Sequence, residues 1–217
     1  MSLERDGYAL LEGVIPEAQV QELIALLEGS GHGRRDLLEL EPVRGLARQV
    51  GPLAGPGAFP VRGLFFDKPP EANWQVPWHQ DLAIAVRERI EIPGYSGWSV
   101  KNGIPHVQPP AEVLERMLAV RISLDDCTSD NGPLRVIPGT HRLGRLSSDQ
   151  IAQMSRVGPA VECCVPAGGA VLMRPLLLHA SSKARKPGHR RVIHLEMARG
   201  DLPGGLSWQA RAEKRDR

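Results

Sequence analysis

Before Phe59, apolar residues recur at the spacing of a helix. Between Pro16 and Gly29 they occupy one helical face, at Val20, Leu23, Ile24 and Leu27. The proline suits a first helical turn and the glycine suits the end of the helix. A second short helix is predicted from about Asp36 to Val50. The pattern therefore predicts a helical layer over about residues 16–50.

From Phe59 to about residue 200, the pattern changes to short apolar runs between glycines and prolines. The runs are VRGLFFD, MLAVRISLD, PLRVIP, AVECCVP, GGAVLMRP, LLLHAS and RRVIHLEMA. In the last run, Val192, His194 and Glu196 share one face of a strand, with the apolar residues between them on the other. Many short strands with such turns are typical of a sandwich or barrel. We expect one mainly β domain over residues 1–217, with the helices flanking it.

Residues 87–110 interrupt this pattern. The segment is rich in proline and glycine and has little strand character. A long irregular segment inside a compact domain is often a binding loop, so we expect a lid-like insertion here.

Composition and charge exclude several classes of protein. The 217 residues are 41% hydrophobic and 24% charged, with a formal net charge of +2, which gives no case for a nucleic-acid partner. No apolar run is long enough for a membrane span, and the acidic start does not resemble a signal peptide. The basic cluster Arg211–Arg217 is interpreted as a solvated tail.

The cysteines favour a cytoplasmic location. Three cysteines, two of them adjacent, make a poor disulfide framework and fit a reducing compartment. A Cys-Cys pair can serve redox chemistry or bind metal. Because Cys163 and Cys164 lie in VECCVP, which is typical of a strand, ordinary core or sheet residues are the preferred interpretation.

The first candidate metal ligands are His79 and Asp81, in the sequence WHQD. Residues i and i+2 of a strand point to the same face, so both can reach one ion. Two histidines and one carboxylate form the facial triad of non-haem iron(II) oxygenases. A lone His-x-Asp pair is common by chance, however, and the second histidine must come from elsewhere in the chain.

His179 is the preferred second histidine. It ends the apolar run RPLLLHAS, where a buried strand would reach the mouth of a barrel, although a hydrogen-bonded core histidine fits there too. The sequence around His141 and His189 favours turns. His106 lies in the expected lid and is a candidate substrate contact. His194 fits a cavity-lining residue and a hydrogen-bonded barrel residue equally well.

Arg190 is the candidate cation for an anionic co-substrate such as 2-oxoglutarate. An arginine side chain binds a carboxylate through two parallel hydrogen bonds. Arg190 follows His179 by eleven residues and opens the next strand, so a hairpin is predicted to bring the two together. The alternative is that Arg190 and Arg191 belong to a solvated turn.

Four segments, in order, resemble the phytanoyl-CoA dioxygenase family of iron(II)- and 2-oxoglutarate-dependent oxygenases. The resemblance covers most of the chain, through RDGYALLEGVIP, FFDKPPEANWQVPWHQD, LDDCTSDNGPLRVIPGTHRLG and LLLHASSKARKPGHRR. It implies a double-stranded β-helix core, of the jelly-roll or cupin type, over about residues 59–200. It also implies that His79, Asp81 and His179 hold iron(II).

The resemblance further implies which residues bind the co-substrate. Arg190 would hold the distal carboxylate of 2-oxoglutarate and Ser181 would assist it. Leu64 and Arg121 fall near positions that contact the co-substrate. Because an aromatic residue can occupy the place of Arg121 in the family, the role of Arg121 is open, and it can meet the substrate instead.

The expected activity is oxygen-dependent hydroxylation of a C–H bond in a small molecule, with release of succinate and carbon dioxide. Candidate substrate contacts are Trp98, Lys101, His106 and Arg135. Lysines and arginines there are also compatible with ordinary surface charge. The alternatives are a cupin-type metalloenzyme that does not use 2-oxoglutarate and a catalytically silent binding protein of the same fold.

Overall fold

A six-stranded antiparallel sheet forms the centre of the molecule, as the computed structural model shows over residues 2–210. The predicted tail Arg211–Arg217 lies outside these described residues. The strand order is β1-β11-β8-β13-β3-β2. The bounds are Tyr8–Leu11 (β1), Gly33–Arg34 (β2), Phe59–Asp67 (β3), Met117–Ser123 (β8), Ala170–Met173 (β11) and Arg191–Ala198 (β13).

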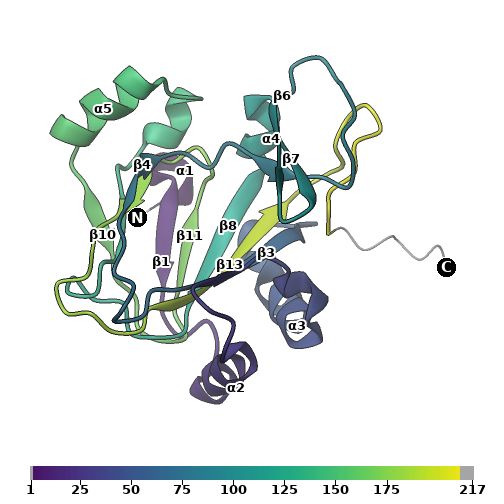
Figure 1. Cartoon of the computed structure of the whole chain (residues 1–217). Coiled ribbons are helices and arrows are strands. Elements are labelled where there is room, and N and C mark those ends of the chain that lie inside the picture. The colour runs from purple at the N-terminus through teal and green to yellow at the C-terminus, as the bar shows by residue number, and fades with distance from the viewer. Residues whose placement is uncertain (1, 211–217) are drawn as a thin grey trace.

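A second, four-stranded antiparallel sheet faces the first (Figure 1). Its order is β10-β9-β12-β4, with bounds Val161–Cys163 (β10), Leu134–Val136 (β9), His179–Ser181 (β12) and Val76–His79 (β4). From β8 onward the chain passes back and forth between the two sheets. This is the predicted double-stranded β-helix, so the mainly β fold class is confirmed. The interpretation of Cys163 as a sheet residue is also confirmed, because it lies buried in β10.

Helices cover the outer face of the six-stranded sheet (Figure 1). Apolar residues of α2 (Glu17–Leu27) and α3 (Glu41–Val50) form one core cluster with the outward side chains of the sheet, including Phe65, Ile193 and Leu195. His194 and Glu196, which alternate with these apolar residues along β13, face the interior between the two sheets, as predicted. Packing on one face thus leaves the other free to line a cavity.

The second predicted helix is divided into two. A short 3₁₀ helix, η1 (Leu37–Glu39), precedes α3, and the two meet at Leu40, which has extended backbone. Pro42 lies in the first turn of α3, where its missing N–H costs nothing, but its ring prevents continuation toward the N-terminus.

The expected lid has more regular structure than predicted. It contains a hairpin of β6 (Ser96–Lys101) and β7 (Ile104–Gln108), and β7 also pairs with β5 (Ile84–Ala85) in a three-stranded sheet. Asn102 and Gly103 connect the hairpin, both with positive φ, at 51° and 77°. An Asn-Gly pair favours this two-residue turn, so the sequence did contain a hairpin signal.

The remaining helices are short or peripheral. They are α1 (Leu3–Asp6), η2 (Gly51–Ala54), α4 (Ala111–Glu115), η3 (Thr140–Leu143) and α5 (Ser148–Val157). Among residues 2–210, no helix combines the length and apolar character needed to cross a membrane.

Candidate metal centre and its cavity

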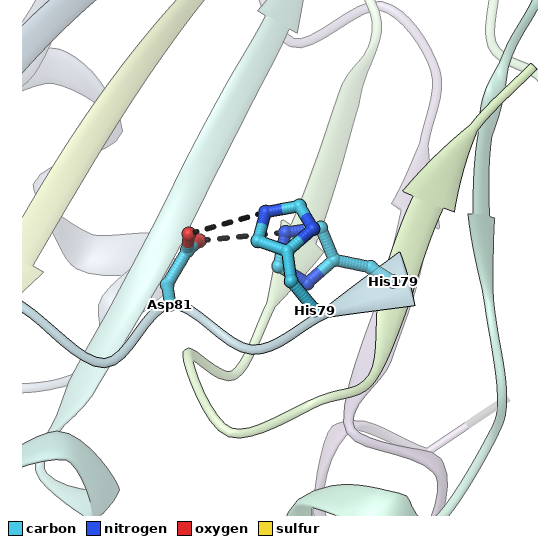
Figure 2. A group of neighbouring side chains, drawn as sticks. All are labelled: His79, Asp81 and His179. Carbon is cyan, nitrogen blue, oxygen red and sulfur yellow. Dashed lines mark ion pairs between the residues drawn. The ribbon is translucent and has the colours of Figure 1, made fainter. Parts of the chain in front are cut away.

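Three predicted ligands meet at the inner face of the four-stranded sheet (Figure 2). His79 ends β4 and His179 begins β12, and the two are directly paired across the strands. Asp81 lies beyond the end of β4, held by a hydrogen bond from its N–H to the carbonyl of Pro175 (2.9 Å). The strand ends at His79, so the expectation that His79 and Asp81 share a strand face is wrong. The irregular segment after β4 nevertheless places the Asp81 carboxylate beside His79.

The ligand atoms are close enough to share one ion. The Asp81 oxygens lie 3.8 Å from Nε2 of His79 and 3.6 Å from Nε2 of His179. All three donor atoms lie within 4.8 Å of one another. Two ligands at right angles on one ion, each at about 2.1 Å, are about 3.0 Å apart, so a small inward movement of the side chains suffices. Two imidazoles and one carboxylate are the donor set that suits iron(II).

Main-chain carbonyls orient both imidazoles. Nδ1 of His79 lies 2.8 Å from the carbonyl of Pro77, and Nδ1 of His179 lies 2.8 Å from that of Leu177. A carbonyl can only accept, so each Nδ1 carries the proton and each Nε2 is left with a free lone pair facing Asp81. Such hydrogen bonds fix the tautomer and the ring orientation of metal ligands.

The protonation states also favour metal binding. Burial disfavours the imidazolium and lowers the pKa of His179 to about 4. Burial alone would raise the pKa of Asp81, but His179, His194, His79 and Arg121 outweigh it, and the pKa lies below its usual value. At neutral pH, His179 is therefore neutral and Asp81 ionised, and neither must lose a proton to bind an ion.

The three ligands line a cavity of about 540 Å³ between the two sheets. His79 and Asp81 keep 39% and 40% of their side-chain surface open, whereas His179 keeps 6%. An ion held here would have room for further ligands on the cavity side, which is the mark of a catalytic rather than a structural site.

Arg190 lies on the opposite wall of the same cavity, directly before β13. The predicted hairpin is wrong: β12 pairs within the four-stranded sheet and β13 within the six-stranded one, so the connection crosses between the sheets. Arg190 is only 8% exposed, and burial lowers its pKa. Its guanidinium forms no hydrogen bond or ion pair with any residue in the described range, and its buried Nε lacks an acceptor.

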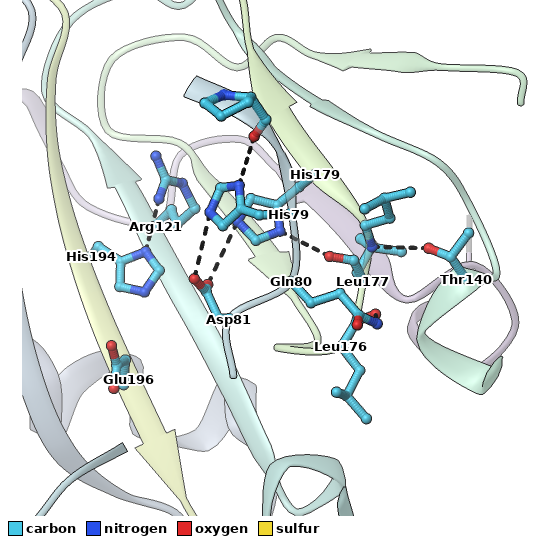
Figure 3. A network of polar contacts seen from close by, with 12 residues as sticks. His79, Gln80, Asp81, Arg121, Thr140, Leu176, Leu177, His179, His194 and Glu196 are labelled. Carbon is cyan, nitrogen blue, oxygen red and sulfur yellow. Dashed lines mark hydrogen bonds and ion pairs between the residues drawn. The ribbon is translucent and has the colours of Figure 1, made fainter. Parts of the chain in front are cut away.

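The other predicted co-substrate residues share this cavity. Ser181, Leu64 and Arg121 all line it. Arg121 lies beside His194 in the pairing of β8 with β13, and its Nη1 lies 2.8 Å from Nδ1 of His194 (Figure 3). Burial and Arg121 lower the pKa of His194 to about 3, so it is a neutral acceptor for the guanidinium. His194 is thus both cavity-lining and hydrogen-bonded, and the two interpretations are compatible.

The predicted substrate contacts divide into two groups. Lys101 lines the cavity. Trp98, His106 and Arg135 do not, which corrects the expectation for these three. The Trp98 ring packs on the lid core and against Arg89, His106 is 1% exposed within the lid sheet, and Arg135 bonds the Ser182 hydroxyl while covering Trp78.

Sequence reasoning missed three polar groups around the cavity. Gln80 joins its own loop to two others, Lys68 lies buried near Arg190, and Arg62 forms a buried ion pair with Glu196. The position of Glu196 on the His194 face of its strand was a signal for it. No pattern in the sequence links Arg62 to Glu196, which lie 134 residues apart.

Comparison with known proteins agrees with this geometry. The chain is 27% identical over 158 residues to an ectoine dioxygenase of Bordetella bronchiseptica, with 65% of the chain and 48% of that protein covered. It is 28% identical over 222 residues to an L-proline trans-4-hydroxylase of Streptomyces griseoviridis, with 84% and 73% covered. The chain thus spans about half the length of the ectoine dioxygenase.

A solved structure shares the fold. The epimerase SnoN, in complex with Fe³⁺, α-ketoglutarate and nogalamycin RO, matches with a TM-score of 0.67 at 18% identity, covering 94% of this chain and 88% of that one. The profile of the phytanoyl-CoA dioxygenase (PhyH) family matches residues 3–192. Because that match takes in most of the sequence, the chain belongs to the phytanoyl-CoA dioxygenase family.

Proposed function

We propose that the chain is a non-haem iron(II)- and 2-oxoglutarate-dependent oxygenase that hydroxylates a C–H bond of a small molecule. His79, Asp81 and His179 hold the iron, and Arg190 holds the distal carboxylate of 2-oxoglutarate. One observation carries the proposal: a buried guanidinium without an acceptor lies in the same cavity as a two-histidine, one-carboxylate triad.

The charges of the cavity support a dicarboxylate as the second ligand. Arg190 and Arg121 line this part of it, and Lys68 lies close enough to Arg190 to be affected by its charge. Asp81 is the acidic residue that faces them and is itself a candidate metal ligand. Buried charges are normally paired, so cations in excess imply an anionic ligand. An enzyme that used the metal alone would gain nothing from them.

The protein's own part is to bind, orient and exclude water. The Arg190 fork and the Ser181 hydroxyl hold one end of the co-substrate, which directs its keto-acid end toward the triad. Leu64, Phe66 and Leu134 supply apolar wall. When bound, iron and 2-oxoglutarate supply oxidation of a C–H bond by O₂, with formation of succinate and carbon dioxide.

An anaerobic titration with Fe(II) and 2-oxoglutarate tests this function. We expect a weak visible charge-transfer band for the wild-type chain and none for His179→Ala. For Arg190→Met, the loss of two charge-assisted hydrogen bonds weakens 2-oxoglutarate binding by about 3 kcal/mol, or roughly 100-fold.

Arg185→Met is the matched control, since Arg185 lies in the same loop but is exposed and paired with Asp130. It should bind 2-oxoglutarate as the wild type does. Absence of the band in the wild-type chain would overturn the proposed function. An unchanged affinity in Arg190→Met would show that another cation holds the carboxylate.

A further inference from the structure

The cavity contains a second polar region, which is formed by residues of β13 and of its neighbour β3. Glu196 follows His194 by two residues on the same strand face (Figure 3), and Arg62 is its direct partner on β3. Nη1 of Arg62 donates to Oε1 of Glu196 over 3.0 Å, and their side chains keep 10% and 15% of their surface open. Both residues line the cavity.

Neither the metal nor the co-substrate accounts for this pair. Removing two charges from water costs more than a single contact returns, so a buried ion pair adds little stability by itself. Within residues 2–210, the Glu196 carboxylate accepts no side-chain hydrogen bond other than the one from Arg62. Burial raises the pKa of Glu196 despite the neighbouring arginine, so the carboxylate is under-compensated. A cationic group arriving in the cavity would relieve this.

The surroundings add positive charge and apolar wall. Lys101 and Arg35 line the cavity here and are exposed, so they mark its open end. His106 does not line the cavity, but it lies nearby in β7, where burial lowers its pKa with smaller contributions from Arg62 and Lys101. Its Nδ1 donates to the carbonyl of Ile104 (2.9 Å), and its Nε2 is left without a donor in residues 2–210. Ile84, Leu114 and Met117 supply apolar surface.

We propose that this region recognises a small dipolar substrate, with a protonated nitrogen against Glu196 and a carboxylate against Arg62 and Lys101. A purely anionic molecule would leave Glu196 uncompensated, and a purely cationic one would meet the excess of arginine and lysine. The hydrocarbon part would lie on the apolar wall, where a C–H bond can face the triad. A cavity of this volume suits a small ligand. This inference rests on the proposed function and names its substrate class.

Ligand-detected NMR with the metal-free full chain tests the inference without turnover. The probes are the neutral protein amino acids, β-alanine and 4-aminobutyrate, each beside its N-acetyl and methyl ester derivatives. We expect at least one parent compound to bind, and each derivative of it, which lacks one charge, to bind at least tenfold more weakly.

Two variants test which protein side chain recognises each charge of the substrate. Glu196→Gln keeps the shape and an acceptor for Arg62, and should reduce the preference for the parent over its N-acetyl derivative to less than threefold. Arg62→Gln should do the same for the preference over the methyl ester. Glu162→Gln is the control, because Glu162 is an exposed strand glutamate on β10 outside the cavity. A folding defect would weaken all three forms of a probe alike, whereas the inference requires a change of selectivity.

The inference is overturned if no dipolar probe binds, if N-acetyl or ester forms bind as well as their parents, or if Glu196→Gln leaves the selectivity unchanged. The charge-transfer band of the same Glu196→Gln chain with Fe(II) and 2-oxoglutarate should match that of the wild type. A missing band in both chains would contradict the proposed function, and the NMR selectivities would still decide the substrate class.

Discussion

Lys68 is a buried lysine that has no acidic partner in the described part of the chain. It is 2% exposed, its Nζ donates to the carbonyl of Ser182 (2.9 Å), and it lies 5.6 Å from the centre of the Trp74 ring. Burial, with a further contribution from the charge of Arg190, lowers its pKa from 10.5 to about 8. At neutral pH the Lys68 side chain of the folded chain is therefore still charged, and burial of this charge lowers the stability of the fold.

The contribution of Lys68 to stability should rise with pH as its side chain loses the proton. Below pH 8, both the folded and unfolded chains hold the proton, and the cost of the buried charge is fully present. Between about pH 8 and 10.5, the folded chain releases the proton first, so the free energy of unfolding gains up to about 3 kcal/mol. Urea unfolding at pH 7, 8.5 and 10 should therefore show the stability of the wild type rising relative to that of Lys68→Met, a comparison in which the opposing titration of the buried cysteines cancels.

Lys183→Met provides the comparison, because Lys183 is exposed and close in sequence to the acceptor Ser182. It should keep the wild-type slope. Equal slopes for Lys68→Met and the wild type would mean that Lys68 is not the titrating group.

At the residue scale, the sequence allowed prediction of those site residues that belong to a recognisable motif. His79, Asp81, His179 and Arg190 stand in short recognisable segments, and the structure places all four around one cavity. Glu196 and Arg62 belong to no motif. Their association depends on the register of two strands, which only the folded sheet determines.

At the scale of elements, Gln80 joins three loops beside the metal centre. It is 6% exposed, and its Nε2 donates to the carbonyls of Leu176 (2.7 Å) and Gly144 (2.9 Å). Its Oε1 accepts from the N–H of Leu146 (2.8 Å). These bonds hold the turn after β4 against the turn that precedes His179 (Figure 3), and so fix Asp81 relative to the histidines.

Gln80→Leu should weaken both the fold and the metal site. It leaves three main-chain groups without partners, which costs about 3 kcal/mol or more of unfolding free energy. Loss of such support lowers metal affinity by about 10- to 100-fold, so an anaerobic Fe(II) titration should show weaker binding. Gln153→Ala on the exposed side of α5 should change neither quantity. If Gln80→Leu behaved like that control, the three-loop junction would have no supporting role.

Helices and strands were predictable from the sequence where a local pattern of apolar and polar residues determines the secondary structure. The alternation in RVIHLEM predicted which face of β13 lines the cavity, because burial on one face imposes a two-residue period. The apolar run before His179 was misleading: a hydrogen bond from the Leu177 N–H to the Arg174 carbonyl closes a turn there, and β12 begins only at His179. Because this turn is buried, its residues are apolar, and its composition resembles that of a buried strand.

At the scale of the whole molecule, the candidate site lies between two sheets. The histidines belong to the four-stranded sheet, while Arg121 and His194 belong to the six-stranded one and Arg190 directly precedes its strand β13. Iron and 2-oxoglutarate bound together would link the two sheets across the cavity.

Loading should therefore stabilise the whole chain. At 100 times the dissociation constant, a ligand specific for the folded state adds about 2.7 kcal/mol, which for a chain of this size raises Tm by roughly 5–10 °C. Anaerobic calorimetry with Fe(II) and 2-oxoglutarate should show this rise, and a chelator should reverse it. His179→Ala should show little response. A wild-type Tm that does not respond would contradict a link between the sheets.

The imidazoles of the candidate ligands His79 and His179 are oriented by the main-chain carbonyls of Pro77 and Leu177. Every amino acid has such a carbonyl, so replacement of either side chain leaves the acceptor in place. The Arg62–Glu196 pair consists of two side chains, and a single codon change can remove either one. The orientation of the two candidate ligand rings therefore tolerates side-chain replacement at Pro77 and Leu177, whereas the polar region around Glu196 depends on the identity of both of its side chains.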